Sequence, residues 1–305
     1  TGLPQRDWPA LEPVTVMAAP TSCTLIISIY NQAAQLRRVL ESVARQRNCN
    51  FDIVIADDGS ADAVQPVLDE FREQHPAYKL AHVWHEDRGF YKTIILNKAF
   101  RAANGEYIIV IDGDMLLHDR FIENHLRHAR PDRVLCGYRG VKLGGQITAE
   151  LLSGVRPFSQ NLFVLLWQAL RGQLEEVSRG LVINNHTLRR LVARRSKRLS
   201  GCNFSTFREN LFRVNGMDET ILVYGFEDFE LGHRLTLAGI RLTDVSRCCN
   251  TYHLHHARRV ADDADTLRAI KLNILGSRAL QCRYGLETLD HGSTVEDFLP
   301  GGQAT

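Results

Sequence analysis

Two aspartates separated by one glycine, Asp112 and Asp114, are the first residues of this chain whose types and spacing could do chemistry. They follow residues 107–111, a short apolar run rich in β-branched side chains, which predicts a strand buried on both faces, as in a parallel sheet. Open α/β sheets bind ligands at the carboxyl ends of their strands, and two carboxylates joined by a flexible residue can turn toward one hard cation. The alternative interpretation is a solvated Asp-Gly turn.

The elements that would position these aspartates alternate through the first half of the chain. Apolar runs predict strands, and apolar residues at helical spacing predict helices between them. The expected strands cover residues 24–30, 51–56, 79–84, 107–111 and 133–138. The expected helices cover residues 36–43, 64–71, 91–103 and 116–129. This alternation predicts an α/β fold with a doubly wound, mostly parallel sheet and right-handed crossovers.

The first turn from strand to helix limits how this sheet could bind a nucleotide. Residues 28–32 contain no glycine, which excludes a dinucleotide-binding fingerprint or a phosphate-cradling P-loop at this turn. A diphosphate bound here needs positive charge from another source, and a divalent cation on acidic residues is the expected one.

A second acidic pair, Glu227 and Asp228, precedes an expected helix over residues 231–238. Acidic side chains at such a place also suit a helix N-cap and first turn, where the macrodipole favours them. A structural role and a chemical role can hold at once.

Three histidines close an expected strand over residues 249–256: His253, His255 and His256. Alternation sends His253 and His255 to one face of a strand and His256 to the other, unless the strand has already ended. On that geometry, not all three can bind one ion. The alternative is a surface feature or a satisfied polar strand end.

We expect one large domain over residues 23–260, preceded by a leader over residues 1–22 and followed by a C-terminal helix and polar tail over residues 261–305. The final helix is expected over residues 266–284. Within the domain, residues 139–200 predict a helical and basic insertion.

Two stretches of this insertion carry unusual side chains. Residues 161–170 are strongly apolar but too short to span a bilayer. Residues 188–198 are basic, and the simpler interpretation is a solvated helix face or loop. The alternative is that Arg189–Arg198 contacts an anionic acceptor or a membrane surface.

The composition excludes several classes of protein. Hydrophobic residues make up 44% of the chain and charged residues 24%, as in ordinary globular proteins, and a net charge of +2 argues against a nucleic-acid partner. The seven cysteines form no CxxC pair, which predicts mostly reduced thiols in a cytoplasmic protein. No apolar run reaches the roughly 18 residues of a transmembrane helix, and the first residues lack a signal-peptide pattern. Peripheral contact with the inner face of the membrane stays open.

In their order and spacing, these motifs resemble the inverting glycosyltransferases of family 2, which have the GT-A fold. The matching pieces are SIYNQ at 28–32, DDGS at 57–60, residues 87–97, DGD at 112–114, residues 201–219, YGFEDFE at 224–230 and YHLHH at 252–256. The later pieces are most similar to the branch that contains bacterial polysaccharide and lipopolysaccharide transferases, with a galactosyltransferase-like C-terminal region. The resemblance covers about residues 24–256. Each motif alone is weak, and their combination makes the resemblance specific.

The resemblance implies roles for the matching positions. Donor binding falls to Tyr30, Asn31, Asp57, Asp58, Asp112 and Gly201. A Mn²⁺ or Mg²⁺ ion is expected at Asp112 and Asp114 with a histidine, His253 first and His256 next. Asp228 is the expected catalytic base, with Glu227 as its partner in the catalytic pair. Arg88 and Lys92 are candidates for the diphosphate, or else an exposed helix face.

The chemistry of such a reaction suits these side chains. Displacing a nucleoside diphosphate builds positive charge on the sugar and negative charge on the leaving phosphate, which a divalent ion offsets. An aspartate is ionised at neutral pH, so it can accept the proton of the attacking hydroxyl. Attack in one step from the opposite face inverts the anomeric centre.

The resemblance implies a nucleotide-sugar donor, with UDP the first choice, from which a hexosyl or N-acetylhexosaminyl group is transferred. The expected acceptor is a hydroxyl of a glycan or lipid-linked glycan in cell-surface polysaccharide synthesis. Tyr224 and Phe226 stand where relatives commonly carry tryptophan and glycine, so the resemblance does not define the acceptor pocket.

Two other functions compete with sugar transfer. A nucleotidyltransferase that makes activated sugars has a similar sheet, but it usually begins with a glycine-rich basic loop that residues 30–34 lack. A non-catalytic glycan-binding protein could keep the fold, but the acids at Asp112, Asp114 and Asp228 argue against a decayed site.

Overall fold

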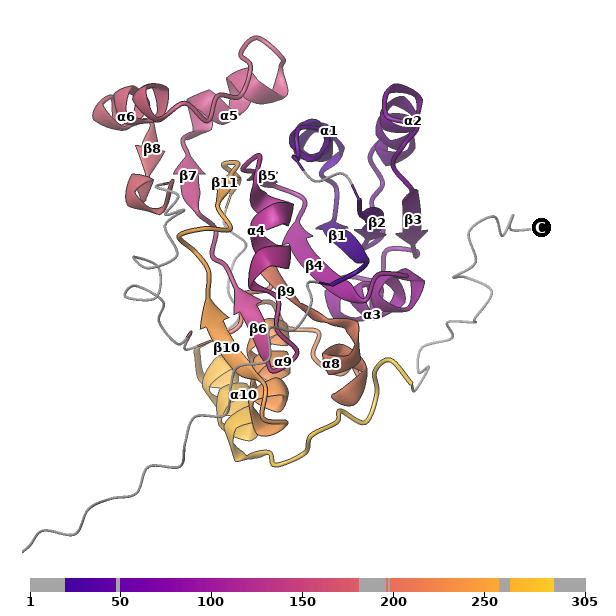
Figure 1. Ribbon diagram of the computed structural model, residues 1–305. Helices are drawn as coiled ribbons and strands as arrows, with labels where there is room; N and C mark the ends of the chain where they lie inside the picture. Colours follow the sequence, from indigo (N-terminus) through magenta and orange to yellow (C-terminus); the bar gives the residue numbers. More distant parts are fainter. Residues whose placement is uncertain (1–19, 48–49, 181–195, 197, 258–263, 288–305) are drawn as a thin grey trace, which may run out of the picture.

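The structure is a computed structural model, and it describes residues 20–47, 50–180, 196, 198–257 and 264–287 (Figure 1). Most of the expected leader over residues 1–22, most of the basic run over residues 188–198 and most of the expected tail lie outside the described residues. Six cysteines lie within the described ranges, and all six are buried.

The larger sheet has seven strands within the described residues, in the order β10-β6-β9-β4-β1-β2-β3. They are β1 (Cys23–Ile29), β2 (Asp52–Asp57), β3 (Leu80–Trp84), β4 (Tyr107–Asp112), β6 (Arg133–Cys136), β9 (Asn203–Phe207) and β10 (Arg241–Asp244). The four neighbouring strands β3, β2, β1 and β4 are parallel to one another, and β9 is antiparallel to both of its neighbours. The strand order reverses between β1 and β4, and ligands of open α/β sheets bind at such a switch point.

Helices cover both faces of this sheet (Figure 1). Leu25 and Ile27 of β1 join one core and Ile26 joins the other, because successive side chains of a strand point to opposite faces. The first core includes residues of α1 (Ala33–Ala44), α2 (Val64–Gln74) and α4 (Phe121–His128), and the second includes residues of α3 (Lys92–Ala102), α8 (Arg208–Arg213) and α9 (Glu227–Leu237). Burial on both faces explains the continuous apolar runs of the strands, and it confirms the predicted doubly wound α/β fold.

A smaller sheet positions the histidines. Its order is β5-β11-β7-β8, with β5 (Met115–Leu117), β7 (Val141–Leu143), β8 (Leu174–Glu175) and β11 (Thr251–His253). His253 pairs with Met115 in an antiparallel register, and the N–H of Leu254 donates to the carbonyl of Asp114 at 3.0 Å. The end of β11 therefore lies beside the second aspartate of the glycine-spaced pair.

Two expected elements are wrong for the same physical reason, because tertiary pairing overrides the local pattern. Residues 116–129 do not form one helix, since Met115–Leu117 pair with β11 and α4 begins only at Phe121. The strand expected over residues 249–256 ends at His253, and the N–H of His255 donates instead to Thr148 Oγ1 at 2.9 Å.

The insertion and the C-terminal helix also differ in extent from the expectations. Residues 139–200 include the strands β7 and β8 as well as α5 (Gly145–Leu152), α6 (Leu162–Leu170) and a 3-10 helix (Val177–Gly180). The last helix, α10 (Ala264–Gly276), ends before the expected residue 284. Within the described ranges, no helix combines the length and apolar character that crossing a bilayer requires.

Candidate active site

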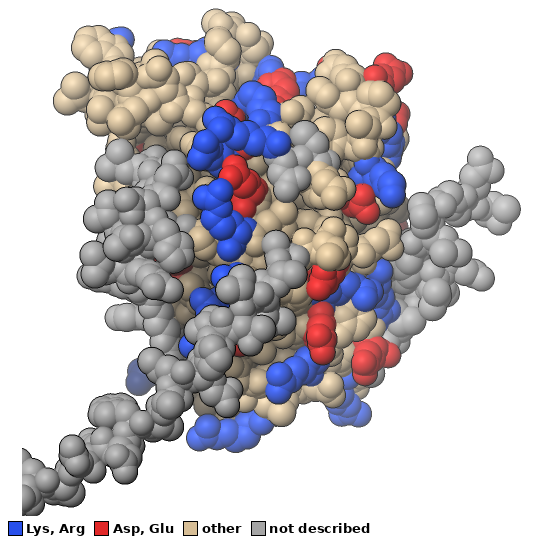
Figure 2. All heavy atoms as spheres, in the orientation of Figure 1, with Lys and Arg blue, Asp and Glu red and all other residues tan. Residues whose placement is uncertain are grey.

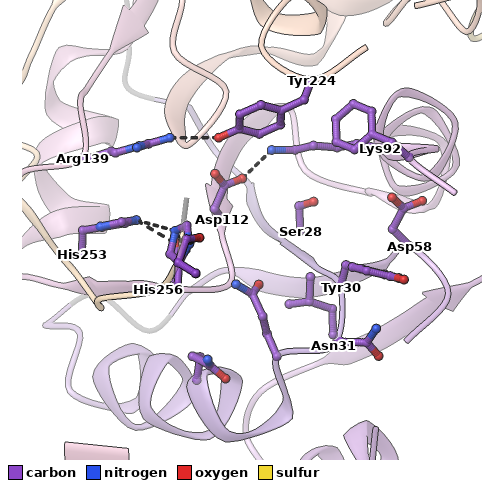
Figure 3. A pocket seen from close by; sticks show the side chains of 16 residues that line it. Ser28, Tyr30, Asn31, Asp58, Lys92, Asp112, Arg139, Tyr224, His253 and His256 are labelled. Atoms are coloured by element: carbon purple, nitrogen blue, oxygen red, sulfur yellow. Dashed lines mark hydrogen bonds and ion pairs between the residues drawn. The ribbon is translucent and has the colours of Figure 1, made fainter. Parts of the chain in front are cut away.

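A cavity of about 350 Å³ lies at the carboxyl ends of β1 and β4, at the switch point of the larger sheet (Figure 3). Eight of the predicted site residues line it. The predicted residues in its lining are Tyr30, Asn31, Asp58, Lys92, Asp112, Asp114, His253 and His256. The cavity thus unites motifs from both halves of the sequence.

Asp112 pairs with Lys92 at the centre of the cavity. The two residues are the last of β4 and the first of α3, and Nζ of Lys92 lies 2.6 Å from Oδ1 of Asp112. The Lys92 side chain is 13% exposed. Burial alone would lower its pKa, but the charge of Asp112, followed by those of Glu227 and Asp228, holds the pKa well above its usual value. Lys92 is therefore a charged group that both acidic pairs share.

Asp114 forms a cluster with His253 and His256 that has the composition of a metal site. Oδ2 of Asp114 lies 3.4 Å from Nε2 of His253 and 3.1 Å from Nε2 of His256. One ligand atom from each residue lies within 4.8 Å of the other two. Oδ1 of Asp114 is buried and has no hydrogen-bond partner among the described residues. A divalent cation would satisfy this oxygen, so the donor set fits a metal ion of the kind that accepts carboxylate and imidazole ligands.

The geometry of β11 decides which histidines meet. Because the strand ends at His253, the chain turns and brings His256 back to the same aspartate, whereas His255 is exposed. Burial raises the pKa of Asp114, but hydrogen bonds from His253 and His256 outweigh it and hold this pKa well below the usual range. Asp112 lies outside this cluster and is paired with Lys92.

Glu227 and Asp228 occupy the first turn of α9, where neither side chain caps the helix. Oδ2 of Asp228 accepts a hydrogen bond from the N–H of Gly201 at 2.9 Å, and Oε2 of Glu227 accepts one from the N–H of Gly225 at 2.7 Å. Burial raises the pKa of both carboxyls. A raised pKa makes the ionised carboxylate a stronger base.

Backbone contacts connect Asp228 to the glycine-spaced aspartates. Gly201, which donates to Asp228, precedes Cys202, and the carbonyl of Cys202 accepts a hydrogen bond from the N–H of Asp112 at 3.4 Å. Gly201, predicted to bind the donor, thus also holds the carboxylate of Asp228 in position. The second acidic pair is therefore linked to the first through this backbone contact and through the shared Lys92, although Glu227 and Asp228 do not line the cavity themselves.

The nucleotide-binding candidates occupy the other side of the cavity. Asp58 lines it, with Oδ1 2.8 Å from Nε2 of His85 and Oδ2 accepting from the N–H of Tyr91 at 3.2 Å. The Tyr30 hydroxyl donates to Asp87 at 2.9 Å. Asn31, also in the lining, has a positive φ of 52° and accepts a hydrogen bond from the N–H of Ala61 at 2.8 Å.

Three predicted donor residues lie away from the lining: Gly201, described above, and Asp57 and Arg88. Asp57 is 1% exposed and pairs with His82 at 3.0 Å, so it supports the turn that carries Asp58. Burial raises the pKa of Asp57, but the hydrogen bonds from His82 and Ser60 outweigh burial and hold this pKa below its usual value. Arg88 has a side chain that is 61% exposed and pairs with Glu86 at 3.6 Å. The exposed alternative therefore describes Arg88 better, and Lys92 is the candidate that reaches the cavity.

The structure adds Arg139, which the sequence predictions missed. Its Nη2 donates to the Tyr224 hydroxyl at 3.1 Å, and the Tyr224 ring packs edge-to-face on Phe90. In Figure 3 Arg139 and Lys92 enter the cavity from opposite sides. The sequence signal for Arg139 was its position directly before Gly140. Gly140 forms a bridge with Tyr252 and has a φ of +64°, and a Cβ at this position would collide with Thr251.

The sequence matches models of known protein families over most of the proposed domain. Residues 24–179 match the model of glycosyl transferase family 2, and residues 190–257 match that of the N-terminal domain of galactosyltransferase. Chondroitin synthase of Escherichia coli is 23% identical over 259 residues, which cover 82% of this chain and 37% of that protein. The chain spans between 33% and 53% of the length of the first curated relatives it matches.

Solved structures confirm the GT-A fold. The mannosyltransferase PcManGT from Pyrobaculum calidifontis, in complex with GDP-Man and Mn²⁺, has a TM-score of 0.54 and 18% identity, with 87% of this chain and 65% of that chain covered. S. aureus TarS 1–349, in complex with UDP-GlcNAc, has a TM-score of 0.54 and 17% identity, with 88% of this chain and 69% of that chain covered. The family model spans just over half of the 305 residues, and the chain belongs to glycosyl transferase family 2.

Proposed function

We propose that this protein is a metal-dependent inverting glycosyltransferase that moves a sugar from a nucleotide-diphosphate sugar to a hydroxyl of a glycan or glycolipid. The observation that carries the proposal is the convergence on one cavity. The pair of Asp112 with Lys92 and the Asp114–histidine cluster line it, and the charges of Glu227 and Asp228 act on the same Lys92. Residues 23–260 would form the catalytic domain and residues 261–305 an addition to it.

The donor would lie across the switch point of the sheet. UDP is our first choice for the nucleotide, since TarS was solved with UDP-GlcNAc, and the mannosyltransferase neighbour with GDP-Man leaves room for other bases. Asp58 and Tyr30 would contact the nucleoside, because both line the cavity and lie on the side away from His253 in Figure 3. The aromatic ring of Tyr30 suits stacking on a base.

Asp114, His253 and His256 would hold the metal ion, with Asp112 as the remaining candidate ligand. Mn²⁺ or Mg²⁺ bound there would act as a Lewis acid that offsets the charge of the diphosphate. A neighbour solved with Mn²⁺ supports manganese, and the two imidazole ligands favour it over magnesium.

Two cationic side chains would bind the leaving diphosphate directly. Lys92 enters the cavity beside Asp112, and Arg139 is held across from it by the neutral hydroxyl of Tyr224. A guanidinium can offer two parallel N–H groups to one phosphate, which positions as well as neutralises it.

Asp228 would be the base that accepts the proton of the acceptor hydroxyl. The Gly201 N–H fixes one of its oxygens, which leaves the other for the acceptor. Attack from the face of the sugar opposite the diphosphate would invert the anomeric centre. The match to chondroitin synthase supports an acceptor in cell-surface polysaccharide synthesis. We place the protein in the cytoplasm, at the inner face of the membrane, because its cysteines form no CxxC pair.

The test is Asp228→Asn in the full chain, assayed for release of nucleoside diphosphate from a panel of nucleotide sugars, with and without a chelator. The amide keeps the shape and the Gly201 hydrogen bond but cannot accept the proton, so transfer should be lost while donor binding stays near the wild-type level. Asp69→Asn, an exposed change on α2 with a side chain 54% exposed, is the control and should keep full activity. Transfer by Asp228→Asn at a rate near that of the wild type would overturn the proposal.

A further inference from the structure

Helix α6 turns its more apolar face toward solvent. Five large side chains are exposed on it: Leu162 (45%), Phe163 (82%), Leu166 (45%), Trp167 (62%) and Leu170 (84%). The face toward the protein carries Leu165 and the polar Gln168, which are 3% and 7% exposed. A helix on the surface of a globular protein normally shows the opposite arrangement, and such a patch marks an interaction site.

The apolar surface continues into the segment before α6. Val155 is 80% exposed in the connection from α5. In Figure 2 the surface in the region of α6, at the upper left, is largely uncharged. The stretch over residues 151–173 contains two arginines, Arg156 and Arg171, and no aspartate or glutamate. Positive charge therefore flanks the apolar helix at both ends.

An arginine-lined cavity of about 240 Å³ lies where this connection meets α1. Arg38, Arg45 and Arg156 line it, together with Glu41 and apolar residues that include Phe158. The guanidinium groups have carboxylate neighbours, since Arg38 pairs with Glu41 at 2.5 Å and Arg156 with Glu150 at 2.9 Å. Nε of Arg38 is buried and has no hydrogen-bond partner among the described residues. This donor could still bind one further anionic oxygen.

We propose that α6 docks this protein onto an anionic lipid bilayer, lying in the plane of the interface. Phe163, Trp167 and Leu170 enter the boundary between headgroups and acyl chains, where aromatic and aliphatic side chains are favoured. Arg156 and Arg171 reach the lipid phosphates from the two ends of the helix. Nine residues of helix span about 14 Å, which suits a helix that lies on a bilayer and does not cross it.

Charge favours a bilayer over a second copy of the chain. In a two-fold symmetric pair, the same patch faces itself, so the arginines at the ends of α6 would approach those of the other copy. An anionic lipid surface pairs with the same arginines favourably.

The docked helix is connected to the candidate active site through the smaller sheet. β8 follows α6 and pairs with β7, and β7 pairs with β11, which carries His253. Docking through α6 would therefore fix the orientation of the cavity relative to the bilayer. The inference does not depend on sugar transfer and can be tested separately.

The experiment is flotation of the full chain with vesicles of phosphatidylcholine alone or mixed with phosphatidylglycerol. Wild-type protein should float with the mixed vesicles. The triple variant Phe163→Ser, Trp167→Ser, Leu170→Ser should lose at least about tenfold in affinity, because most of the inserted apolar area is gone. The variant Arg156→Gln, Arg171→Gln should lose the preference for anionic vesicles. Trp84→Ser, at another tryptophan that is 52% exposed, is the matched control and should bind as the wild type does.

Thermal unfolding of each variant shows whether it is folded, and substitutions at these exposed positions should leave the melting temperature near that of the wild type. Failure of the wild type to float with anionic vesicles would overturn the proposal. So would vesicle binding that survives the triple variant and disappears when the arginines of residues 189–198 are neutralised. A wild-type dimer that becomes a monomer in the triple variant, with no vesicle binding, would assign the face to a contact between copies and would also overturn it.

Discussion

Lys92, the first residue of α3, pairs with Asp112, the last residue of β4, with 2.6 Å between the ammonium nitrogen and a carboxylate oxygen. The pair places one positive charge among the carboxylates of Asp112, Glu227 and Asp228. An incoming diphosphate would meet this cation beside the metal cluster. The pair thus connects the sheet that forms the cavity with the helix that brings charge into it.

Replacing Lys92 with methionine should weaken binding of a nucleoside diphosphate by about tenfold or more, because a charge-assisted hydrogen bond contributes about 1.5–3 kcal/mol. Binding of the nucleoside without phosphates should change little. Isothermal titration with UDP and with uridine measures both affinities. Lys79→Met removes an exposed lysine outside the cavity and should leave both unchanged. An unaltered affinity for UDP in Lys92→Met would show that Lys92 does not contact the diphosphate.

The Asp114 cluster predicts different effects for neighbouring histidines. His253→Ala and His256→Ala should each weaken Mn²⁺ binding by at least about tenfold, and should reduce the effect of the metal on UDP affinity, because each removes one imidazole ligand. His255→Ala is the matched control, since His255 comes from the same chain segment and is exposed. Titration of Mn²⁺ by electron paramagnetic resonance gives the affinity without an activity assay. Equal Mn²⁺ affinity in all three variants would place the ion elsewhere.

Arg139 predicts a contribution that is specific to the phosphates. Arg139→Ala should reduce UDP affinity by about tenfold or more and leave uridine affinity intact, and Arg139→Lys should recover only part of the loss, because lysine lacks the planar fork. Tyr224→Phe should have a smaller effect of the same kind, since it removes the hydroxyl that holds Nη2 of Arg139. Arg88→Ala provides the control, with an exposed arginine outside the lining. A parallel loss of uridine affinity in Arg139→Ala would indicate a structural role.

The parts of the fold that were predictable from sequence depend on local pattern. Residues 24–30 and 107–111 could be assigned as strands because burial on both faces makes β1 and β4 almost wholly apolar. Asp112 and Asp114 could be chosen as candidate site residues because they lie at the end of a predicted strand. The extents of β5 and β11 could not be predicted, because their pairing joins residues that are far apart in the chain.

The chemical groupings of the site were less predictable than its members. Asp114, His253 and His256 were all candidates, but only the turn after His253 shows that His256 returns to Asp114 while His255 does not. Arg139 lies in none of the motifs that carry the family resemblance. Its position depends on the pairing of Gly140 with Tyr252. Positions that are set by tertiary contacts of loops leave little local signal.

A buried histidine outside the site predicts how stability should depend on pH. The His125 side chain is fully buried, and Nδ1 lies 2.7 Å from the hydroxyl of Ser205. Burial, together with the nearby His128, lowers the pKa of His125 from 6.5 to about 3. As the pH falls, His125 therefore becomes protonated near pH 6.5 in the unfolded chain but only near pH 3 in the folded chain. The stabilising contribution of neutral His125 is complete above pH 6.5 and is lost as the pH falls toward 3.

Urea unfolding at pH 6.5 and pH 5 measures this effect. The change of about 1.4 kcal/mol per pH unit for one proton gives a loss of about 2 kcal/mol in the free energy of unfolding over this interval. His125→Asn should be less stable than the wild type at both pH values, and its own loss between them should be smaller by about that amount. Phe121→Leu is the matched control, because Phe121 packs against the His125 ring with centroids 4.4 Å apart and its replacement keeps the titrating group. This control should lower stability similarly at both pH values and retain the wild-type slope. If His125→Asn instead keeps the full wild-type slope, His125 is not the group that titrates.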